Sequence, residues 1–181
     1  MANPEKSELI VERLQTYTSK DAEQLGLLRN ALSSDRSSDA LSPRRIALFT
    51  EHEERALIAA RVADSGRIVA CETIAGTPVL EAREEDSDMF GWLGFVSTLP
   101  EDRNLGIGKQ VAIAGMRWCQ DLDIRELKFT SNSHNTERAI ARATYLKYGA
   151  VIVAKGVGPK DTDMFNWSVQ TGLEKLTAGI S

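Results

Sequence analysis

Hydrophobic residues recur along this chain at two spacings, one typical of helices and the other of strands. Apolar positions three or four residues apart predict helices that begin near Ser19, Pro43, Ile107 and Thr136. Alternating or continuous β-branched runs predict strands between them. The expected strands are residues 9–17, 55–63, 67–76, 90–99, 124–130, 150–157 and 163–171.

Glycines interrupt this pattern where turns are expected. Gly66 closes the tripeptide DSG between two strand-forming runs, which is typical of a tight hairpin whose glycine has a positive φ. Gly149 follows the last expected helix in the place of a C-cap. The order strand, helix, helix, three strands, helix, strand, helix and two strands contains no repeat, so we expect a single domain over residues 1–181.

The segment PEDRNLGIGKQ, residues 100–110, combines glycines and cations at the junction of a strand and a helix. Such a turn gathers backbone N–H groups and the positive end of a helix dipole, which together form an anion site. Arg103 and Lys109 add cations, which suits a ligand with more than one phosphate. The alternative is a tight turn without a ligand. The dinucleotide fingerprint is excluded because it needs glycine or alanine at position 111, which is valine here. The P-loop is excluded because it needs four residues between its glycines, and a single residue separates them here.

The pattern Arg-x-x-Gly-x-Gly at Arg103, Gly106 and Gly108, preceded by the dipeptide PE, resembles the pyrophosphate-binding motif of the GNAT acetyltransferase superfamily. A strand follows the helix, and ATYLKYGA at 143–150 is similar to the family's tyrosine-bearing helix end. The resemblance covers roughly residues 9–170. It implies the GNAT fold, an α+β architecture with a mixed, mostly antiparallel sheet of six to seven strands and about four flanking helices.

The resemblance also implies a coenzyme A site. It assigns the pyrophosphate to the main-chain amides of one continuous run: Arg103, Asn104, Leu105, Gly106, Ile107, Gly108 and Lys109. Main-chain groups of Val96 and Thr98 would hold the pantetheine arm as an added strand does. In the family this strand and the next one splay apart, and Gly94 is the expected place for that distortion, with close packing as the alternative.

Tyr145 matches the family's tyrosine, whose hydroxyl lies near the coenzyme A sulfur and can protonate the departing thiolate. The alternative is a core tyrosine at a sheet edge. The family's asparagine, seven residues before this tyrosine, is replaced here by Arg138. Asn135 can still reach the cofactor if the helix begins one turn earlier, and Asn132 competes for the same role.

Acetyl transfer to an amine also needs a polarised carbonyl, which main-chain N–H groups of strand 90–99 can provide, and a base. Candidate bases are Glu72, or Glu84, Glu85 and Asp88, each with a solvated surface charge as the alternative. The acidic run at 81–88 would attract a cationic acceptor. We therefore expect an acetyl-CoA-dependent N-acetyltransferase acting on a primary amine of a small molecule or protein. The alternatives are a non-catalytic acyl-CoA-binding sensor or partner module, and transfer of another acyl group.

Composition narrows the partners and the compartment. The chain has 22 Lys and Arg against 26 Asp and Glu, a net charge of -4 and no basic block, so we expect neither a nucleic-acid nor a membrane partner. The N-terminal residues lack the apolar run of a secretion signal, which favours the cytoplasm. Cys71 and Cys119 are expected as buried thiols, and the sparse cysteines and histidines predict no metal site. A homodimer is left open.

Overall fold

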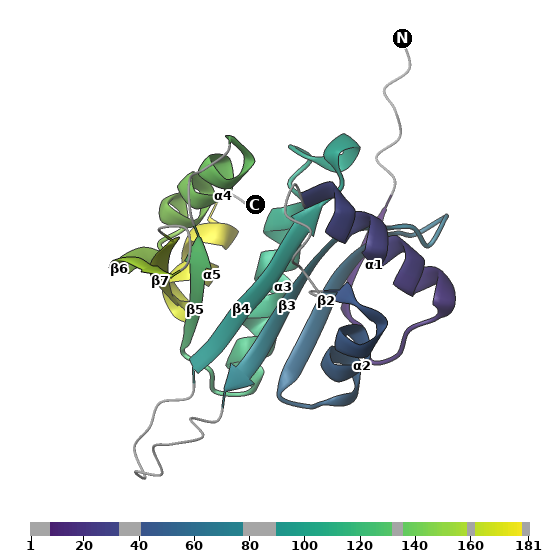
Figure 1. Ribbon diagram of the computed structural model, residues 1–181, viewed down its shortest axis with the longest axis horizontal. Coiled ribbons are helices and arrows are strands. Elements are labelled where there is room, and N and C mark those ends of the chain that lie inside the picture. Colours follow the sequence, from purple (N-terminus) through teal and green to yellow (C-terminus); the bar gives the residue numbers. More distant parts are fainter. Residues whose placement is uncertain (1–7, 33–40, 78–89, 132–135, 159–161, 179–181) are drawn as a thin grey trace. The chain divides into compact units, whose positions relative to one another are not determined.

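The computed structural model describes residues 8–32, 41–77, 90–131, 136–158 and 162–178. They form seven strands and five α-helices in an α+β arrangement (Figure 1). Contacts between residues divide the chain into two compact units: residues 1–74 with 95–115, and residues 75–94 with 116–181. Two strands and one helix run from one unit into the other.

The strands form one mixed sheet, as predicted. Their bounds are Leu9–Arg13 for β1, Arg55–Val62 for β2, Ile68–Thr77 for β3, Phe90–Thr98 for β4, Glu126–Ser131 for β5, Val151–Gly158 for β6 and Thr162–Ser168 for β7. Their order in the sheet is β1-β2-β3-β4-β5-β7-β6. β1 pairs antiparallel with β2, β4 pairs parallel with β5, and β7 pairs antiparallel with both β5 and β6.

The helices occupy the predicted places, with one addition near the C-terminus. Their bounds are Ser19–Leu32 for α1, Pro43–Glu51 for α2, Ile107–Asp121 for α3, Thr136–Lys147 for α4 and Val169–Thr177 for α5. The expected strand 163–171 is wrong at its end, because Ser168 accepts a hydrogen bond from the Thr171 N–H at 3.3 Å and caps α5. None of the described helices is long and apolar enough to span a membrane.

The first strand is also shorter than expected. β1 ends at Arg13, and the residues after it lead into the cap of α1. Thr18 and Asp21 form that cap reciprocally: the Thr18 N–H donates to Asp21 Oδ2 at 2.8 Å, and the Asp21 N–H donates to Thr18 Oγ1 at 3.2 Å. The Leu14 N–H still donates to the Leu57 carbonyl of β2 at 2.9 Å, and the chain then turns toward this cap.

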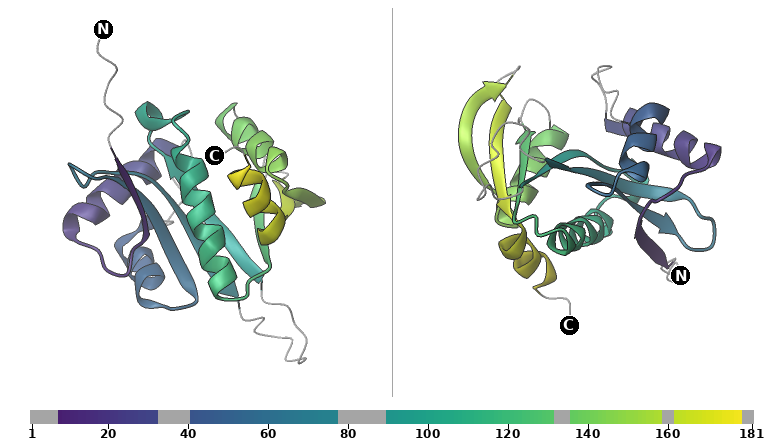
Figure 2. Two further views of the ribbon diagram at one scale, coloured as in Figure 1. Left: turned by 180° about the vertical axis from the view of Figure 1, so that it is seen from behind. Right: turned by 90° about the horizontal axis from the view of Figure 1, so that it is seen from below.

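In the first unit, helices cover both faces of the sheet. α1 and α2 lie on one face of β2 and β3, and the first part of α3 lies on the other (Figure 2). The predicted hairpin is confirmed, because Gly66 has a φ of 64° and its N–H donates to the Val62 carbonyl at 2.8 Å. Burial of large apolar side chains stabilises this unit. Its fully buried side chains include Leu25, Leu28, Ile46, Leu57, Ile58, Ile68 and Ile74.

In the second unit, aromatic side chains form the centre of the core. Phe165 and Trp167 lie two residues apart on β7 and therefore share one face of the sheet. Phe129 on β5 is the register partner of Phe165, and the two rings stack with their centroids 5.0 Å apart. The apolar side chains that are fully buried here include Met116, Ile124, Leu127, Phe165 and Leu176.

α4 ends at Lys147, and Gly149 caps it, as predicted. Gly149 has a φ of 99°, its N–H donates to the Leu146 carbonyl at 3.1 Å, and the Ala150 N–H donates to the Tyr145 carbonyl at 3.0 Å. These two bonds define a Schellman motif. A Cβ at position 149 would lie 3.0 Å from Thr171 Cγ2 of α5. Backbone conformation and packing therefore both require glycine here.

Candidate functional site

The predicted phosphate-binding turn joins β4 to α3 in the first unit. β4 ends at Thr98, and the N–H of Leu99 donates to the Val69 carbonyl on β3 at 2.9 Å. A short 3-10 helix, Pro100–Asp102, then redirects the chain. Arg103 Nε donates to the Thr98 carbonyl at 3.2 Å. The guanidinium therefore ties the turn to the end of the strand.

Two residues of this turn have left-handed backbone conformation. The φ angles are 65° at Asn104 and 78° at Gly106. Leu105 between them is 66% exposed, so no packing of its side chain explains the conformation. A Cβ on Gly106 would meet no atom within 4 Å. Bare main chain at Gly106 is therefore open to close approach by a ligand.

α3 begins directly after the turn. The Gln110 N–H donates to the Gly106 carbonyl at 3.2 Å, which is the first hydrogen bond of the helix. The N–H groups of Ile107, Gly108 and Lys109 come before it and have no acceptor within the helix. Because these amides coincide with the positive end of the helix dipole, the turn fits an anion such as a pyrophosphate.

β4 departs from regular pairing on the way to this turn. Its described pairs with β5 cover only its first three residues, although both strands continue. Further along, the Phe95 N–H donates to Thr73 Oγ1 at 2.8 Å, so a β3 side chain takes part in the contact with β4. Gly94, where the sequence predicted a distortion, lies between these two features.

Glu72 is buried in the first unit. It lies on β3, is 3% exposed, and contacts α3 so closely that a Cβ added to Gly115 would clash with Glu72 Oε1. The alternative of a solvated surface charge is therefore wrong for this residue. Burial raises the pKa of Glu72 from 4.5 to about 8, so the carboxyl is mainly protonated at neutral pH.

Tyr145 lies in the second unit, near the C-terminal end of α4. Its ring contacts Phe129 of β5 and Trp167 of β7, with centroids 4.7 Å and 5.7 Å away. Trp167 Nε1 in turn donates to the Tyr148 carbonyl at 2.9 Å. The two strands and the helix end thus hold the tyrosine ring in one orientation. The catalytic role of the hydroxyl stays a prediction.

The structure describes some of the other predicted residues, whose roles stay predictions. The rest lie outside the described residues. Val96, Thr98 and Lys109 are half-buried, the first two on β4 and the third in the first turn of α3. Outside the described residues lie Asn132, Asn135, Glu84, Glu85 and Asp88. Among described residues, no group of three or more His, Cys, Asp or Glu side chains could hold a metal. Buried free thiols are confirmed at Cys71 and Cys119.

Two contacts that shape these regions were not predicted. One is the bond from Phe95 to Thr73, whose partners are 22 residues apart, so no local pattern could indicate it. The other is an ion pair between Arg142 of α4 and Asp163 of β7. Arg142 lies three residues before Tyr145, and this helical spacing alone could have shown that the two share a face.

Comparison with known proteins identifies the fold that carries this turn. No protein-family model and no curated protein matches the sequence. Solved structures do match. A GNAT-family protein from Desulfovibrio desulfuricans is similar at a TM-score of 0.70 and 14% identity, over 90% of this chain and 99% of that one. A GNAT-family acetyltransferase from Staphylococcus aureus Mu50 has a TM-score of 0.66 at 15% identity, over 90% and 99% of the two chains.

A third similar structure contains a coenzyme A derivative. Arabidopsis thaliana Naa50, in complex with the bisubstrate analogue CoA-Ac-MVNAL, has a TM-score of 0.63 at 18% identity, over 88% of this chain and 98% of that one. The present chain has the GNAT fold, and the fold expected from the glycine motif is confirmed.

Replacing Glu72 with glutamine should flatten the pH dependence of stability. Because the folded-state pKa of about 8 exceeds the ordinary 4.5, the folded protein binds one proton more than the unfolded chain between these values. The free energy of unfolding of the parent should therefore fall as pH rises through this window, by up to about 1.4 kcal/mol per pH unit. Above this pH window, the free energy of unfolding should no longer fall because of Glu72.

Glu72→Gln removes this contribution, so its stability relative to the parent should increase from pH 5 to pH 8. Urea unfolding of both proteins across this range measures the difference. A constant difference between them would contradict the burial-driven shift.

Proposed function

We propose that this chain is an acetyl-CoA-dependent N-acetyltransferase that acetylates a primary amine of a small molecule or a protein. The observation that carries the proposal is the turn from β4 into α3. There a left-handed Gly106, with open space beside it, leads into the first amides of a helix. The GNAT fold supports it, because proteins with this fold include an acetyltransferase and a complex with a coenzyme A derivative.

In the proposed site, the turn holds the pyrophosphate of coenzyme A. Main-chain N–H groups of residues 103–109 donate to the phosphate oxygens, and Lys109 adds a positive charge. Arg103 supports the same turn, because its Nε already fixes the Thr98 carbonyl. Main-chain groups of Val96 and Thr98 hold the pantetheine arm in the manner of an added strand.

The proposed chemistry divides between an acid and a base. Acetyl-CoA supplies the acyl group as a thioester, and N–H groups of β4 polarise its carbonyl. Tyr145 donates its hydroxyl proton to the sulfur as the C–S bond breaks and the amine nitrogen bonds to the acyl carbon. Glu72 takes the amine proton directly or through water. Since its pKa is about 8, this step should accelerate as pH rises through that value.

The proposed acceptor is cationic. Its support is the acidic run at 81–88, which would attract a protonated amine toward the protein before the amine loses its proton. Those residues lie outside the described ones, so the support is their charge alone. Glu84, Glu85 and Asp88 are the alternative bases.

Replacing Gly106 with valine should weaken coenzyme A binding. The side chain would occupy the open space beside the turn and keep phosphate oxygens away from the amides. We expect the dissociation constant, measured by titration calorimetry, to rise at least about tenfold, as for one or two lost charge-assisted hydrogen bonds.

Gly66→Val is the matched control for strain, because Gly66 has a similar φ of 64° and equally open surroundings. Both variants should lose stability, and Gly66→Val should bind coenzyme A like the parent. Parental affinity in folded Gly106→Val would reject the turn as the binding site.

Replacing Tyr145 with phenylalanine should lower turnover and leave coenzyme A affinity unchanged. The substitution removes the proton donor and keeps the ring that packs on Phe129 and Trp167. General acid catalysis typically contributes about 10²- to 10⁴-fold, so the single-turnover rate should fall within that range. Tyr148→Phe is the control at the same helix end. A Tyr145→Phe rate within twofold of the parent would point to water as the acid and reject this role for Tyr145.

A further inference from the structure

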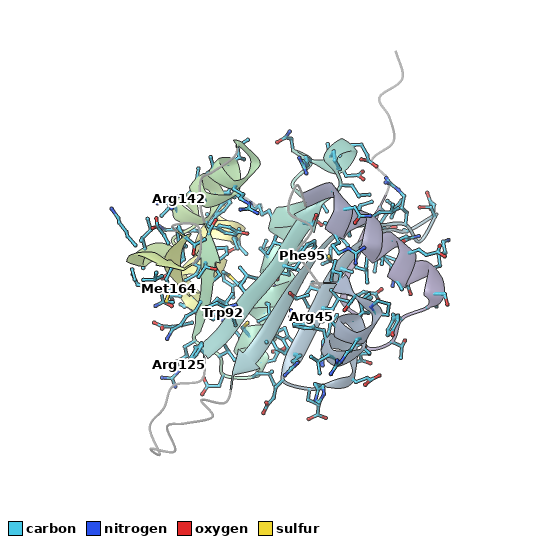
Figure 3. The ribbon with its side chains drawn as sticks, in the orientation of Figure 1. Arg45, Trp92, Phe95, Arg125, Arg142 and Met164 are labelled. Carbon is cyan, nitrogen blue, oxygen red and sulfur yellow. The ribbon has the colours of Figure 1, made fainter. Side chains whose placement is uncertain are left out.

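Arg142 and Tyr145 project from the same face of α4, three residues apart. Figure 3 labels Arg142 on this helix and Met164 on β7. Arg142 Nη1 donates to Asp163 Oδ2 at 2.5 Å, and both side chains are largely shielded, 22% and 13% exposed. A shielded, charge-assisted hydrogen bond between these two side chains resists rotation of the helix relative to β7.

Asp163 connects Arg142 to a third element. Its other oxygen, Oδ1, accepts a hydrogen bond at 3.3 Å from the N–H of Gly156 on β6. Gly156 has a φ of 64° and lies where the register between β6 and β7 is irregular. The hydrogen bond from Arg142 lowers the pKa of Asp163, so the carboxylate stays charged at neutral pH. One carboxylate therefore links α4 to both strands of the β6–β7 pair.

The guanidinium also contacts the aromatic core. Arg142 Cζ lies 5.3 Å from the centroid of the Phe165 ring. Phe165 is completely buried and stacks on Phe129, and Phe129 is the ring that contacts Tyr145 at 4.7 Å. Arg142 thus fixes the helix one turn before Tyr145 and packs on the same stack of rings.

We propose that the Arg142–Asp163 ion pair positions the Tyr145 hydroxyl, an inference that rests on the proposed acetyl transfer. The ion pair and the tyrosine ring are two contacts on one helical face, and both resist rotation of α4 about its axis. Without the ion pair, that resistance is weaker at the turn before Tyr145. Arg142 and Asp163 are positioning residues, because they act through Tyr145.

Steady-state kinetics of Arg142→Gln test the proposal. A small misplacement of a catalytic group can cost up to about 10²-fold in rate, so kcat should fall about 10- to 100-fold while the KM for acetyl-CoA stays near that of the parent. Arg142→Lys keeps the charge and one donor and should recover most of the loss. In a Tyr145→Phe background, Arg142→Gln should lower kcat no further, because its effect requires the hydroxyl. An equal loss in both backgrounds would overturn the proposal.

Arg61→Gln in the first unit is the matched control for loss of stability. Arg61 Nη1 bonds to Asp21 at 2.7 Å, and these side chains are similarly shielded, 17% and 11% exposed. Arg61→Gln should lower the unfolding midpoint without changing kcat. If kcat of Arg61→Gln falls as much as kcat of Arg142→Gln, then general loss of stability explains both effects. That result would overturn the proposal.

Fluorine NMR gives a readout that does not depend on activity. The chain has three tyrosines, so 3-fluorotyrosine in a Tyr17→Phe/Tyr148→Phe background reports Tyr145 alone. Arg142→Gln should shift or broaden this resonance, and Arg61→Gln should not. An unchanged resonance overturns the positioning whatever the activity. A shifted resonance in a protein that transfers no acyl group supports the positioning contact and rejects the proposed function.

Discussion

Between the end of β4 at Thr98 and the start of α3 at Ile107, the main chain adopts the left-handed conformation twice, at Asn104 and Gly106. Few residues tolerate this conformation without strain, and glycine tolerates it best. The left-handed backbone at these two positions lets the chain pass from a strand into a helix within a few residues. It also has a chemical result, because the first amides of the helix then follow directly after Gly106, where a side chain would meet only open space.

A second constraint acts on the other unit. The orientation of Tyr145 depends on the sheet as well as on its own helix, since its ring contacts Phe129 on β5 and Trp167 on β7. The carbonyl of Tyr145 is also the acceptor that closes α4 at the Schellman motif. Side chain and main chain of the same residue thus join the helix to the sheet and to its own C-cap, so both fix the place of the tyrosine ring.

Features that depend on local backbone chemistry could be predicted from the sequence. Gly66 and Gly149 have the positive φ expected of a hairpin and a C-cap, and the glycine motif led to the correct fold. α5 was missed because Phe165, Trp167 and Val169 alternate like a strand, although Ser168 is a typical helix cap.

Features that depend on long-range packing could not be predicted in this way. Glu72 packs against Gly115, which lies on a helix far along the chain and whose missing side chain leaves room for the carboxyl. Pairing of Thr73 with Phe95 and of Arg142 with Asp163 likewise joins segments that are distant in sequence. Only the charge of Glu72 inside an otherwise apolar run indicated that something unusual occurs on β3.

The central claim is that the chain transfers an acyl group from coenzyme A to an amine. The most direct test incubates the purified protein with acetyl-CoA and a panel of primary amines, including polyamines and lysine peptides, while free thiol and acetylated amine are both measured. The account predicts thiol release above the acceptor-free rate with at least one amine, with one acetylated product formed for each thiol. Binding of coenzyme A without thiol release for any amine would contradict it and identify a binding module.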